Sequence, residues 1–587
     1  MKKLTFLFIL VKLSLQVSFA QKEDNIWVFG YDSNTFPEYP GADRITLNFS
    51  DSLTITYSHG IGMLLKESNI SICDSTGKLL LVSNSCYIEN GEGKEIENGD
   101  GLNPGWVYDN RCNWPNLSYP YDNNMILLQA PDSPAIYHLF HTRTYATIQP
   151  LVAFRDVLFR TKIDMSLNSG NGKVVFKNQL LVQDTLHPDG LHAVRHANGR
   201  DWWVATAKTH SNKYYLLLLT PDVITIKEQN VGETTSEEGG GEIVFSPDGR
   251  KMARFNSRDD LRVFDFDRCT GELSNPIYIP IQDDADNDVS SGLAWSADGH
   301  YLYAAEIERI LQFDMWASDI AASKIIIAER EPNSECQSGS SIGYLELGPD
   351  GRIYCRPVSG QRCMHRVGRP ERQGADCEFV HYYYRFDFAY KGLPHFPNFR
   401  LGPIDGSPCD TLGIDNHPLA GWRYDKTGGL GVDFTSVSWY EPTQWQWDFG
   451  DPGSGASNNS AEKHPSHTFS APGGYEVCLT VSNQYGSDTK CKMVYVETVS
   501  SGEPGAGESA VVFSPNPTGG ELRWSGLPAG GTVTARVYDA LGSLRLERET
   551  AEARVDLGDL TDGVYFVALM DDKGRRVAAK AVVLAKK

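Results

Sequence analysis

The strongest constraint on the fold is a tight turn that recurs about every fifty residues. The turn glycines are Gly199, Gly249, Gly299 and Gly351, at intervals of 50, 50 and 52 residues. Each follows an Asn or Asp and separates two short apolar runs. Asn-Gly and Asp-Gly supply the positive φ angles of a two-residue hairpin turn, so each repeat predicts a β-hairpin. A period of this length built from hairpins indicates a β-propeller.

The number of repeats sets the expected number of blades. Two looser turns precede the series, at 74–77 and 131–134, which makes six blades. A seventh blade would combine strands from both ends, 26–29 and 45–47 beside 379–383, and so close the ring without open sheet edges. We therefore expect an all-β chain in which 21–405 form a seven-bladed propeller. Six or eight blades are the alternatives, and an open solenoid or a pair of sandwiches is less favoured.

The repeat itself resembles known propeller repeats. Residues 245–250 read FSPDGR and residues 295–300 read WSADGH. Both strings resemble repeats of Tol-type and WD-type propellers. The resemblance is clear in the three later blades and fades toward the N-terminus.

A second domain is expected over 419–498, after a linker at 406–418. Its marks are the strings WQWDFGD at 445–451, HTF at 467–469 and PGGY at 472–475. The alternation of apolar residues after Tyr475 predicts a strand with one buried face. These strings closely resemble a PKD domain, which implies an immunoglobulin-like β-sandwich. Pro452 stands where the family more often has glycine, and we expect a locally altered loop there.

The chain ends in a third module. A Gly- and Ser-rich linker at 499–510 precedes 511–587, which open with Ser-Pro-Asn-Pro and continue as short strand-like runs with a basic end. This region resembles the C-terminal sorting domain of the type IX secretion system of Bacteroidetes. The resemblance implies a small β-sandwich that is handled by that secretion machinery.

The N-terminus indicates export. Residues 1–20 combine two lysines, an apolar run over 4–17 and small residues at Ser18 and Ala20, the pattern of a secretory signal peptide. No later segment has about 18 uninterrupted apolar residues, so we expect no transmembrane segment in the mature chain. Together with the tail, this predicts a secreted or surface-attached protein.

Eleven cysteines in an exported chain make disulfides plausible. The favoured pair is Cys478 with Cys491, because both lie equally far from one hairpin turn and would face each other. Since an odd count leaves one thiol over, we expect Cys269 to be free. Two weaker pairs are Cys363 with Cys377 and Cys336 with Cys355.

Charge and motifs restrict the chemistry. The net charge of −21, with a pI of about 5.1, makes the chain repel phosphate backbones, so nucleic acid is not an expected partner.

Two patterns were considered as metal sites. His192 and His196 on one strand lie roughly 13 Å apart, too far to share a zinc ion. Asp284, Asp286 and Asp288 alternate as calcium ligands do. The full EF-hand register fails, so we interpret them as a solvated acidic loop, with adventitious calcium as the alternative.

Trp202 and Trp203 are adjacent on one predicted strand. Neighbouring strand residues point to opposite faces, so one indole could be exposed as a platform for a sugar or peptide. Because adjacent blades cover both faces of a blade, core packing of both is the favoured interpretation.

The leading hypothesis is an exported, non-catalytic binding or adhesion protein. Its propeller would bind an unknown protein or polysaccharide, and its PKD domain would serve as a spacer or as a second contact. The alternative is a secreted polysaccharide- or peptide-processing enzyme with its site in the propeller channel. No cofactor is expected apart from calcium.

Overall fold

The computed structural model describes residues 22–30, 42–112, 118–120, 122–148, 151–188, 190–235, 239–281, 292–331, 341–356, 358, 360–496, 512–514, 518–525, 532–538, 544–561, 563–570 and 576–584. The signal peptide, the acidic loop with Asp284, Asp286 and Asp288, and the linker at 499–510 lie outside these residues and stay predictions. The chain divides into two compact units, Met1–Thr498 and Val499–Lys587.

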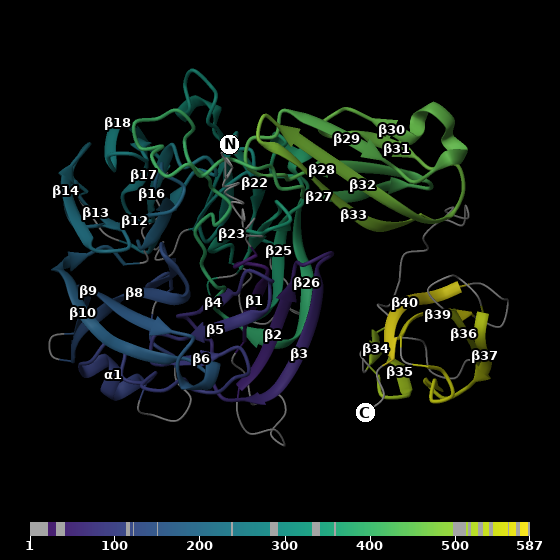
Figure 1. Ribbon diagram of the computed structural model, residues 1–587. Helices are drawn as coiled ribbons and strands as arrows, with labels where there is room; N and C mark the ends of the chain where they lie inside the picture. The colour runs from purple at the N-terminus through teal and green to yellow at the C-terminus, as the bar shows by residue number, and fades with distance from the viewer. Residues whose placement is uncertain are drawn as a thin grey trace, which may run out of the picture. The chain divides into compact units, whose positions relative to one another are not determined.

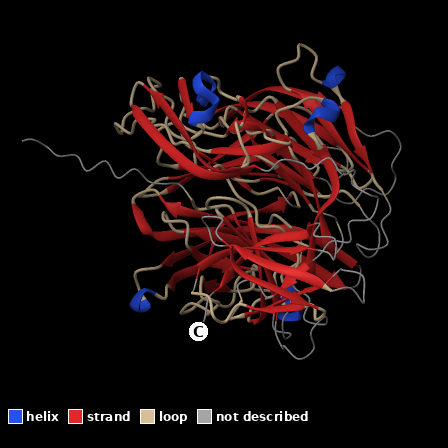
Figure 2. Cartoon of the chain, turned by 90° about the vertical axis from the view of Figure 1, so that its right-hand side faces the viewer, coloured by secondary structure: helices blue, strands red, loops and turns tan. Residues whose placement is uncertain are grey.

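The described strands of 26–390 form seven antiparallel sheets (Figures 1 and 2). The first two sheets have three strands and the other five have four. In sheet order, the strands are β1 (Ile26–Phe29), β2 (Ala42–Asn48) and β3 (Thr54–Ile61); β4 (Ile70–Cys73), β5 (Leu79–Ser83) and β6 (Ile88–Asn90); β7 (Met125–Ala130), β8 (Ser133–Ile148), β9 (Leu151–Asp164) and β10 (Lys173–Leu186); β11 (His192–Arg195), β12 (Trp202–Ala207), β13 (Lys213–Leu219) and β14 (Ile224–Asn230); β15 (Gly241–Phe245), β16 (Lys251–Asn256), β17 (Asp260–Asp267) and β18 (Glu272–Ile279); β19 (Gly292–Trp295), β20 (Tyr301–Ala305), β21 (Arg309–Asp314) and β22 (Ile325–Glu329); β23 (Leu345–Leu347), β24 (Ile353–Cys355), β25 (Gln361–Val367) and β26 (Phe379–Tyr390).

The first strands of successive sheets pack against one another. β11, β15, β19 and β23 are in contact in that order, as are β1, β4 and β7. Each sheet is therefore a blade with its first strand innermost, which is the arrangement of a β-propeller. The strands β15 and β19 are wholly buried, whereas the outer strands β14 and β18 consist mostly of exposed and partly exposed residues.

The propeller ring closes without a shared blade. β1 pairs with β2, and β26 pairs with β25, so the predicted mixed blade is wrong. The local hairpin already supplies β1 with a hydrogen-bonded partner. Aromatic packing joins the first and last sheets instead: the Trp27 ring lies 5.3 Å from that of Tyr354, and Phe29 lies 5.0 Å from Tyr390.

The repeated turn is longer than the predicted two-residue turn. In the fifth sheet the Gly249 amide donates to the Ser246 carbonyl at 2.8 Å, and Ser246 pairs across the hairpin with Lys251. The positive φ of 70° falls on Gly249 and not on the two central residues. The physical reason is Pro247, whose ring holds φ negative and excludes a type I′ turn.

The serine and aspartate of the repeat stabilise this turn. Ser246 Oγ donates to Asp248, and the Arg250 amide donates to the same carboxylate at 3.0 Å. In the sixth sheet Ser296 and the His300 amide bind Asp298 in the same way, at 2.6 and 3.1 Å. The Ser-x-Asp-Gly string is therefore a structural device, and it places an aspartate at the same turn of the fifth and sixth sheets.

After β26 the chain folds back over this turn side of the propeller. We call residues 394–404 the crossing segment. It contacts several sheets: His395 Nε2 lies 3.2 Å from the Leu191 carbonyl, Asn398 donates to the Pro247 carbonyl at 2.7 Å, and Arg400 pairs with Asp24 at 2.6 Å. The segment is thereby fixed across the inner strands.

Three disulfides are present among the described residues. Cys478 and Cys491 face each other in one hairpin and are bonded, as predicted. Cys269 is bonded to Cys409, so the prediction of a free thiol there is wrong. The two are 140 residues apart, and only the return of the chain over the propeller brings them together. A third bond joins Cys86 to Cys112, just after α1 (Trp106–Arg111).

The weaker cysteine pairs were wrong as well. Cys355 and Cys377 are free and buried, so neither Cys336/Cys355 nor Cys363/Cys377 forms. Burial among apolar side chains makes such thiols behave as small hydrophobic residues.

The second domain is a two-sheet sandwich. One sheet contains β27 (Trp422–Gly428), β28 (Gly431–Ser436) and β31 (Ser466–Thr468); the other contains β30 (Asn459–Ser460), β29 (Gln444–Asp448), β32 (Gly473–Asn483) and β33 (Gly486–Val496). Trp447 and the alternating residues of β32 form its core. A short 3₁₀ helix begins at Pro452, which is the altered loop expected there.

The C-terminal unit is a smaller sandwich. Its sheets are β34 (Val512–Ser514), β35 (Glu521–Ser525) and β38 (Arg554–Asp556), and β37 (Leu544–Thr550), β36 (Val533–Tyr538), β39 (Gly563–Met570) and β40 (Arg576–Leu584). Both sheets contribute to one apolar cluster that includes Leu522, Val537 and Val567.

Candidate functional site

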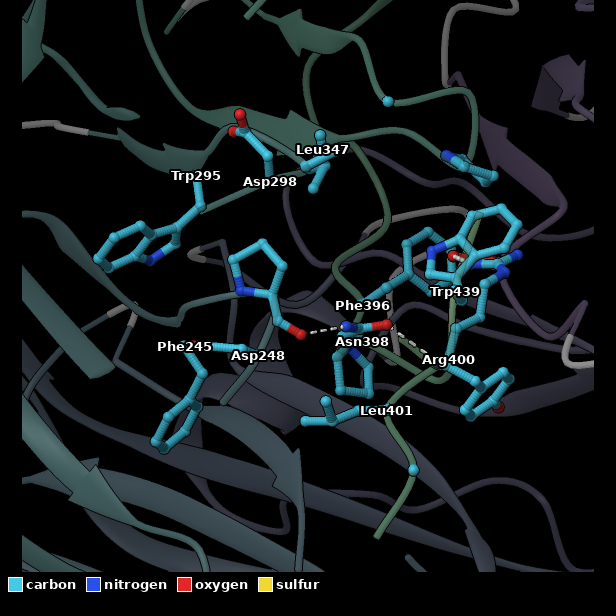
Figure 3. A pocket seen from close by; sticks show the side chains of 18 of the residues that line it. Phe245, Asp248, Trp295, Asp298, Leu347, Phe396, Asn398, Arg400, Leu401 and Trp439 are labelled. Atoms are coloured by element: carbon cyan, nitrogen blue, oxygen red, sulfur yellow. Dashed lines mark hydrogen bonds and ion pairs between the residues drawn. The ribbon is translucent and has the colours of Figure 1, made fainter. Parts of the chain in front are cut away.

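A pocket of about 430 Å³ lies between the propeller turns and the PKD domain (Figure 3). One wall comes from the turns that follow β15, β19 and β23. The crossing segment supplies a second wall, and the loop between β28 and β29 supplies a third. Three parts of the chain that are far apart in sequence therefore form one cavity.

The propeller wall carries the repeat aspartates. Asp248 and Asp298 both line the pocket, and each receives hydrogen bonds from its own turn. Arg250 lies 3.9 Å from Asp248 on the same rim. These turns have fixed backbones, so the carboxylates are held in place before any ligand arrives.

The PKD wall contains aromatic residues on a strained loop. Trp439, Tyr440 and Trp445 line the pocket. Tyr440 and Glu441 have φ angles of 63° and 50°, which side-chain-bearing residues rarely adopt. Asn483 holds the loop by donating to the Tyr440 carbonyl at 2.9 Å. Such backbone strain persists where the surroundings enforce it, often at binding sites.

The floor of the pocket is an acid–imidazole cluster. Glu346 from β23 lies 3.5 Å from His395 Nδ1, and the His192 ring lies 4.7 Å from that of His395. Burial raises the pKa of Glu346 well above its usual value, and burial lowers the pKa of both histidines. Burial therefore favours the uncharged form of each of these three groups.

The remaining charges near the pocket are balanced. Asp24 is paired with Arg400, which also lies over the Trp439 ring at 4.7 Å. Arg268 donates to the backbone carbonyls of Arg195 and Gly402. The pocket is also lined by Asp248, Asp298 and Glu441 and by the cations Arg250 and Lys463. The pocket thus combines aromatic surface with polar groups of both signs.

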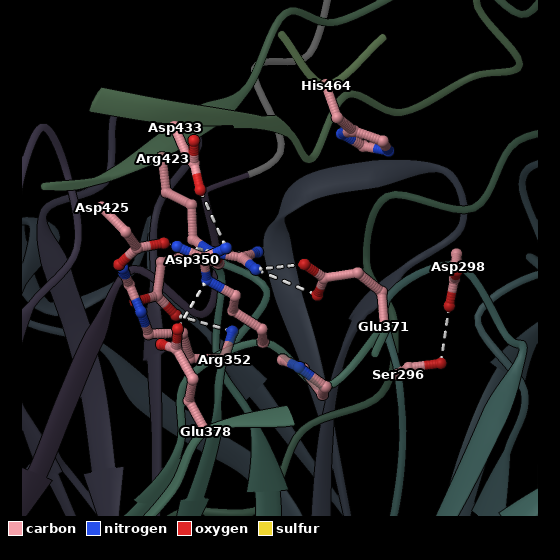
Figure 4. Close-up of polar contacts among 12 residues, drawn as sticks. Ser296, Asp298, Asp350, Arg352, Glu371, Glu378, Arg423, Asp425, Asp433 and His464 are labelled. Carbon is pink, nitrogen blue, oxygen red and sulfur yellow. Dashed lines mark hydrogen bonds and ion pairs between the residues drawn. The ribbon is translucent and has the colours of Figure 1, made fainter. Parts of the chain in front are cut away.

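Ion pairs hold the PKD domain against the propeller (Figure 4). The buried Arg423 of β27 binds Glu371 through two contacts of 2.8 and 2.9 Å. Arg352 of the propeller pairs with Asp425, and Arg369 pairs with Asp433 at 3.0 Å. The Cys269–Cys409 bond ties the predicted linker at 406–418 to the same face. The pocket therefore has rigid walls on both sides.

The predicted tryptophan platform does not exist. Trp202 is fully buried and Trp203 is 4% exposed. Arg195 covers the Trp202 ring at 3.8 Å, and Trp203 Nε1 donates to the Arg268 carbonyl. Neighbouring blades cover both faces of the strand, so both indoles belong to the core, which was the favoured interpretation. The calcium candidates Asp284, Asp286 and Asp288 lie outside the described residues.

Most of the pocket residues carry no recognisable motif in the sequence. His192 was considered only with His196, whereas the structure places it beside His395. Trp445, two positions before the core residue Trp447 on β29, is partly buried against the core and also lines the pocket. One sequence feature could have indicated that the crossing segment is not a strand: prolines and aromatic residues between 394 and 399 without the alternation of a strand.

Comparison with known proteins identifies two of the domains. Residues 428–498 match the family model of the PKD domain, and residues 512–584 match that of the secretion system C-terminal sorting domain. The PKD1 domain of the Vibrio cholerae metalloprotease PrtV is 30% identical, over 14% of this chain and 100% of that chain, with a TM-score of 0.13. A search of curated proteins finds no match.

Two further solved structures extend over more of the chain. A putative 6-phosphogluconolactonase from Bacteroides fragilis is 13% identical, over 64% of this chain and 98% of that chain, with a TM-score of 0.37. PorZ, a surface component of the type IX secretion system of Porphyromonas gingivalis, is 11% identical, over 93% of this chain and 96% of that chain, with a TM-score of 0.19.

The molecule is a multidomain exported protein with a β-propeller and two β-sandwiches. Its second domain belongs to the PKD family, and its tail is a type IX sorting domain. The protein is accordingly secreted or attached to the outer-membrane surface. Within the described part of the chain, no helix has the length and apolar character of a membrane span. The same part contains no cluster of three or more metal-ligating side chains.

Proposed function

We propose that this protein is a non-catalytic binding protein that captures a segment of a protein or polysaccharide in the pocket between its propeller and its PKD domain. The observation that carries the proposal is the pocket itself, whose walls come from two domains locked together by ion pairs and a disulfide. Pre-formed concave sites with aromatic walls and a few polar groups are typical of ligand binding.

The charge pattern favours a neutral, polar ligand. Burial favours the uncharged forms of the floor residues, and the rim carries carboxylates and cations together. A strongly charged ligand would lose hydration without finding a field of the opposite sign. In this proposal the PKD domain is a wall of the site and not a spacer.

Ala297 offers a direct test of the pocket. It is exposed, lines the cavity and occupies a turn position that tolerates bulk, so Ala297→Trp should fill the space without disturbing the core. We expect the purified protein to bind on a glycan or peptide array and the variant to lose at least about tenfold in affinity.

Ser75→Trp is the matched control, because Ser75 is an exposed turn residue of the second sheet outside the pocket. It should bind as the unmodified protein does. Absence of binding on both arrays, or equal losses in the two variants, would contradict the proposal.

One observation favours an enzyme as the second candidate. Glu346 has a raised pKa and lies beside His395 at the floor of a pocket, as a general acid would. A hydrolase acting on glycosides or peptides would then release cleaved products from the array ligands. Loss of those products in Glu346→Gln, with binding retained, would favour this candidate over pure binding.

A further inference from the structure

Next to the pocket, the sixth sheet presents an exposed tryptophan. Trp316 follows β21 and is 69% exposed, more than any other large hydrophobic side chain described. An indole that stays in water gives up the free energy that its burial would contribute to folding. Its sequence neighbours Ser318 and Asp319 are exposed and polar.

The exposed ring is held rigidly. It stacks on the His300 imidazole with 3.8 Å between ring centroids and 13° between planes. His300 in turn stacks on the ring of Tyr301 at 4.0 Å, and Tyr301 is 6% exposed. We call these three rings the aromatic stack. Its inner end is anchored in the propeller, and its outer end faces solvent.

Asp314 fixes the geometry of the stack. One carboxylate oxygen lies 3.1 Å from His300 Nε2 and accepts the Trp316 backbone amide at 2.9 Å. The same side chain therefore orients the imidazole and the turn that carries the indole. A flat aromatic surface with its rotamer already fixed loses little conformational entropy when a ligand covers it.

The stack adjoins the pocket through Asp298. The His300 backbone amide donates to Asp298 at 3.1 Å, and Asp298 lines the pocket. A ligand that extends from the pocket past this carboxylate reaches the stack next. Carboxylates that accept hydrogen bonds beside a flat indole suit a sugar ring, which has hydroxyl donors at its edge and C–H groups on its face.

We infer that the aromatic stack is a binding subsite for one sugar ring of a neutral oligosaccharide whose remaining rings occupy the pocket. This inference rests on the proposed function and names its ligand class. A peptide is less suited, because extended peptides bind through a free strand edge, side-chain pockets or an aromatic-lined groove, and a single exposed flat ring provides none of these.

The test compares Trp316 variants with oligosaccharide probes. Cellohexaose, maltohexaose, chitohexaose and mannohexaose are titrated calorimetrically into the full mature chain. We expect at least one to bind, Trp316→Ala to weaken that binding about tenfold, and Trp316→Phe to weaken it about threefold. Because Trp316 is exposed, the unfolding temperature of both variants should equal that of the unmodified protein.

Trp106→Ala is the matched control, since Trp106 is 46% exposed on α1 and does not line the pocket. Its affinity should not change. Unchanged affinity in Trp316→Ala, or failure of all four probes to bind, would overturn the inference. Peptide binding that Ala297→Trp abolishes and Trp316→Ala leaves intact would overturn the sugar subsite and leave the proposed function standing.

Discussion

Glu242 illustrates what single residues contribute to this molecule. It is 2% exposed on β15, accepts hydrogen bonds from Asn123 and from the Leu293 amide, and has His395 and Glu346 nearby. Burial raises its pKa from 4.5 to about 8, because the loss of hydration outweighs the attraction to His395 and the hydrogen bonds from Leu293 and Asn123, which lower it. In the PKD domain the opposite holds for Asp451. Burial favours its neutral form, yet hydrogen bonds from Ser470 and His467 outweigh burial and lower its pKa.

Glu242 makes stability depend on pH. The folded state keeps the proton up to about pH 8, whereas the unfolded chain releases it near 4.5. The contribution of Glu242 to the free energy of unfolding is complete below pH 4.5 and is lost as pH rises through 8. We predict that Glu242→Gln has a larger free energy of unfolding than the unmodified protein. This difference should grow with pH by at most about 1.4 kcal/mol per pH unit.

Chemical denaturation at several pH values between 5 and 8 measures this difference. Glu272→Gln, an exposed substitution on β18, should give a curve parallel to that of the unmodified protein. A parallel curve for Glu242→Gln would show that the buried carboxyl is already ionised.

At the scale of elements, the crossing segment organises the site. It is not a strand, yet it contacts the first, fourth and fifth sheets and places His395 beside Glu346. The Cys269–Cys409 bond lies just beyond it and closes a loop of 140 residues. Because a long loop loses more entropy on closure than a short one, this bond should stabilise more than the hairpin bond of the PKD domain.

We predict that Cys269→Ser/Cys409→Ser lowers the free energy of unfolding by about 2 kcal/mol more than Cys478→Ser/Cys491→Ser does. Calorimetric unfolding of the two double variants measures both losses of stability. The unmodified protein reduced with dithiothreitol is the common reference. Equal shifts in unfolding temperature would indicate that the crossing segment is held by its other contacts alone.

At the scale of the whole molecule, two functions are separated along the chain. The propeller and the PKD domain form one compact unit that contains the pocket, and the sorting domain belongs to a second unit with its own core. The proposed binding pocket and the sorting domain therefore lie in different units. A change in one unit should leave the task of the other intact.

Removal of 511–587 tests this separation. We expect the shortened protein to accumulate in the periplasm, because the secretion machinery recognises the tail, and to keep its array binding. Fractionation followed by immunoblotting measures the location, and a periplasmic reporter carrying 511–587 is the control that should leave the cell. Normal surface delivery of the shortened protein would refute the role of the tail.

The sequence alone was sufficient for the class of fold, the two sandwiches, the Cys478–Cys491 pair and the route of export. Those features depend on local sterics: turn glycines, strand alternation and short strings of residues. The pocket, the Cys269–Cys409 bond and the exposure of Trp316 depended on the tertiary structure. Each is decided by which distant segment covers a side chain, and chain segments that meet only after folding leave no periodic trace in the sequence.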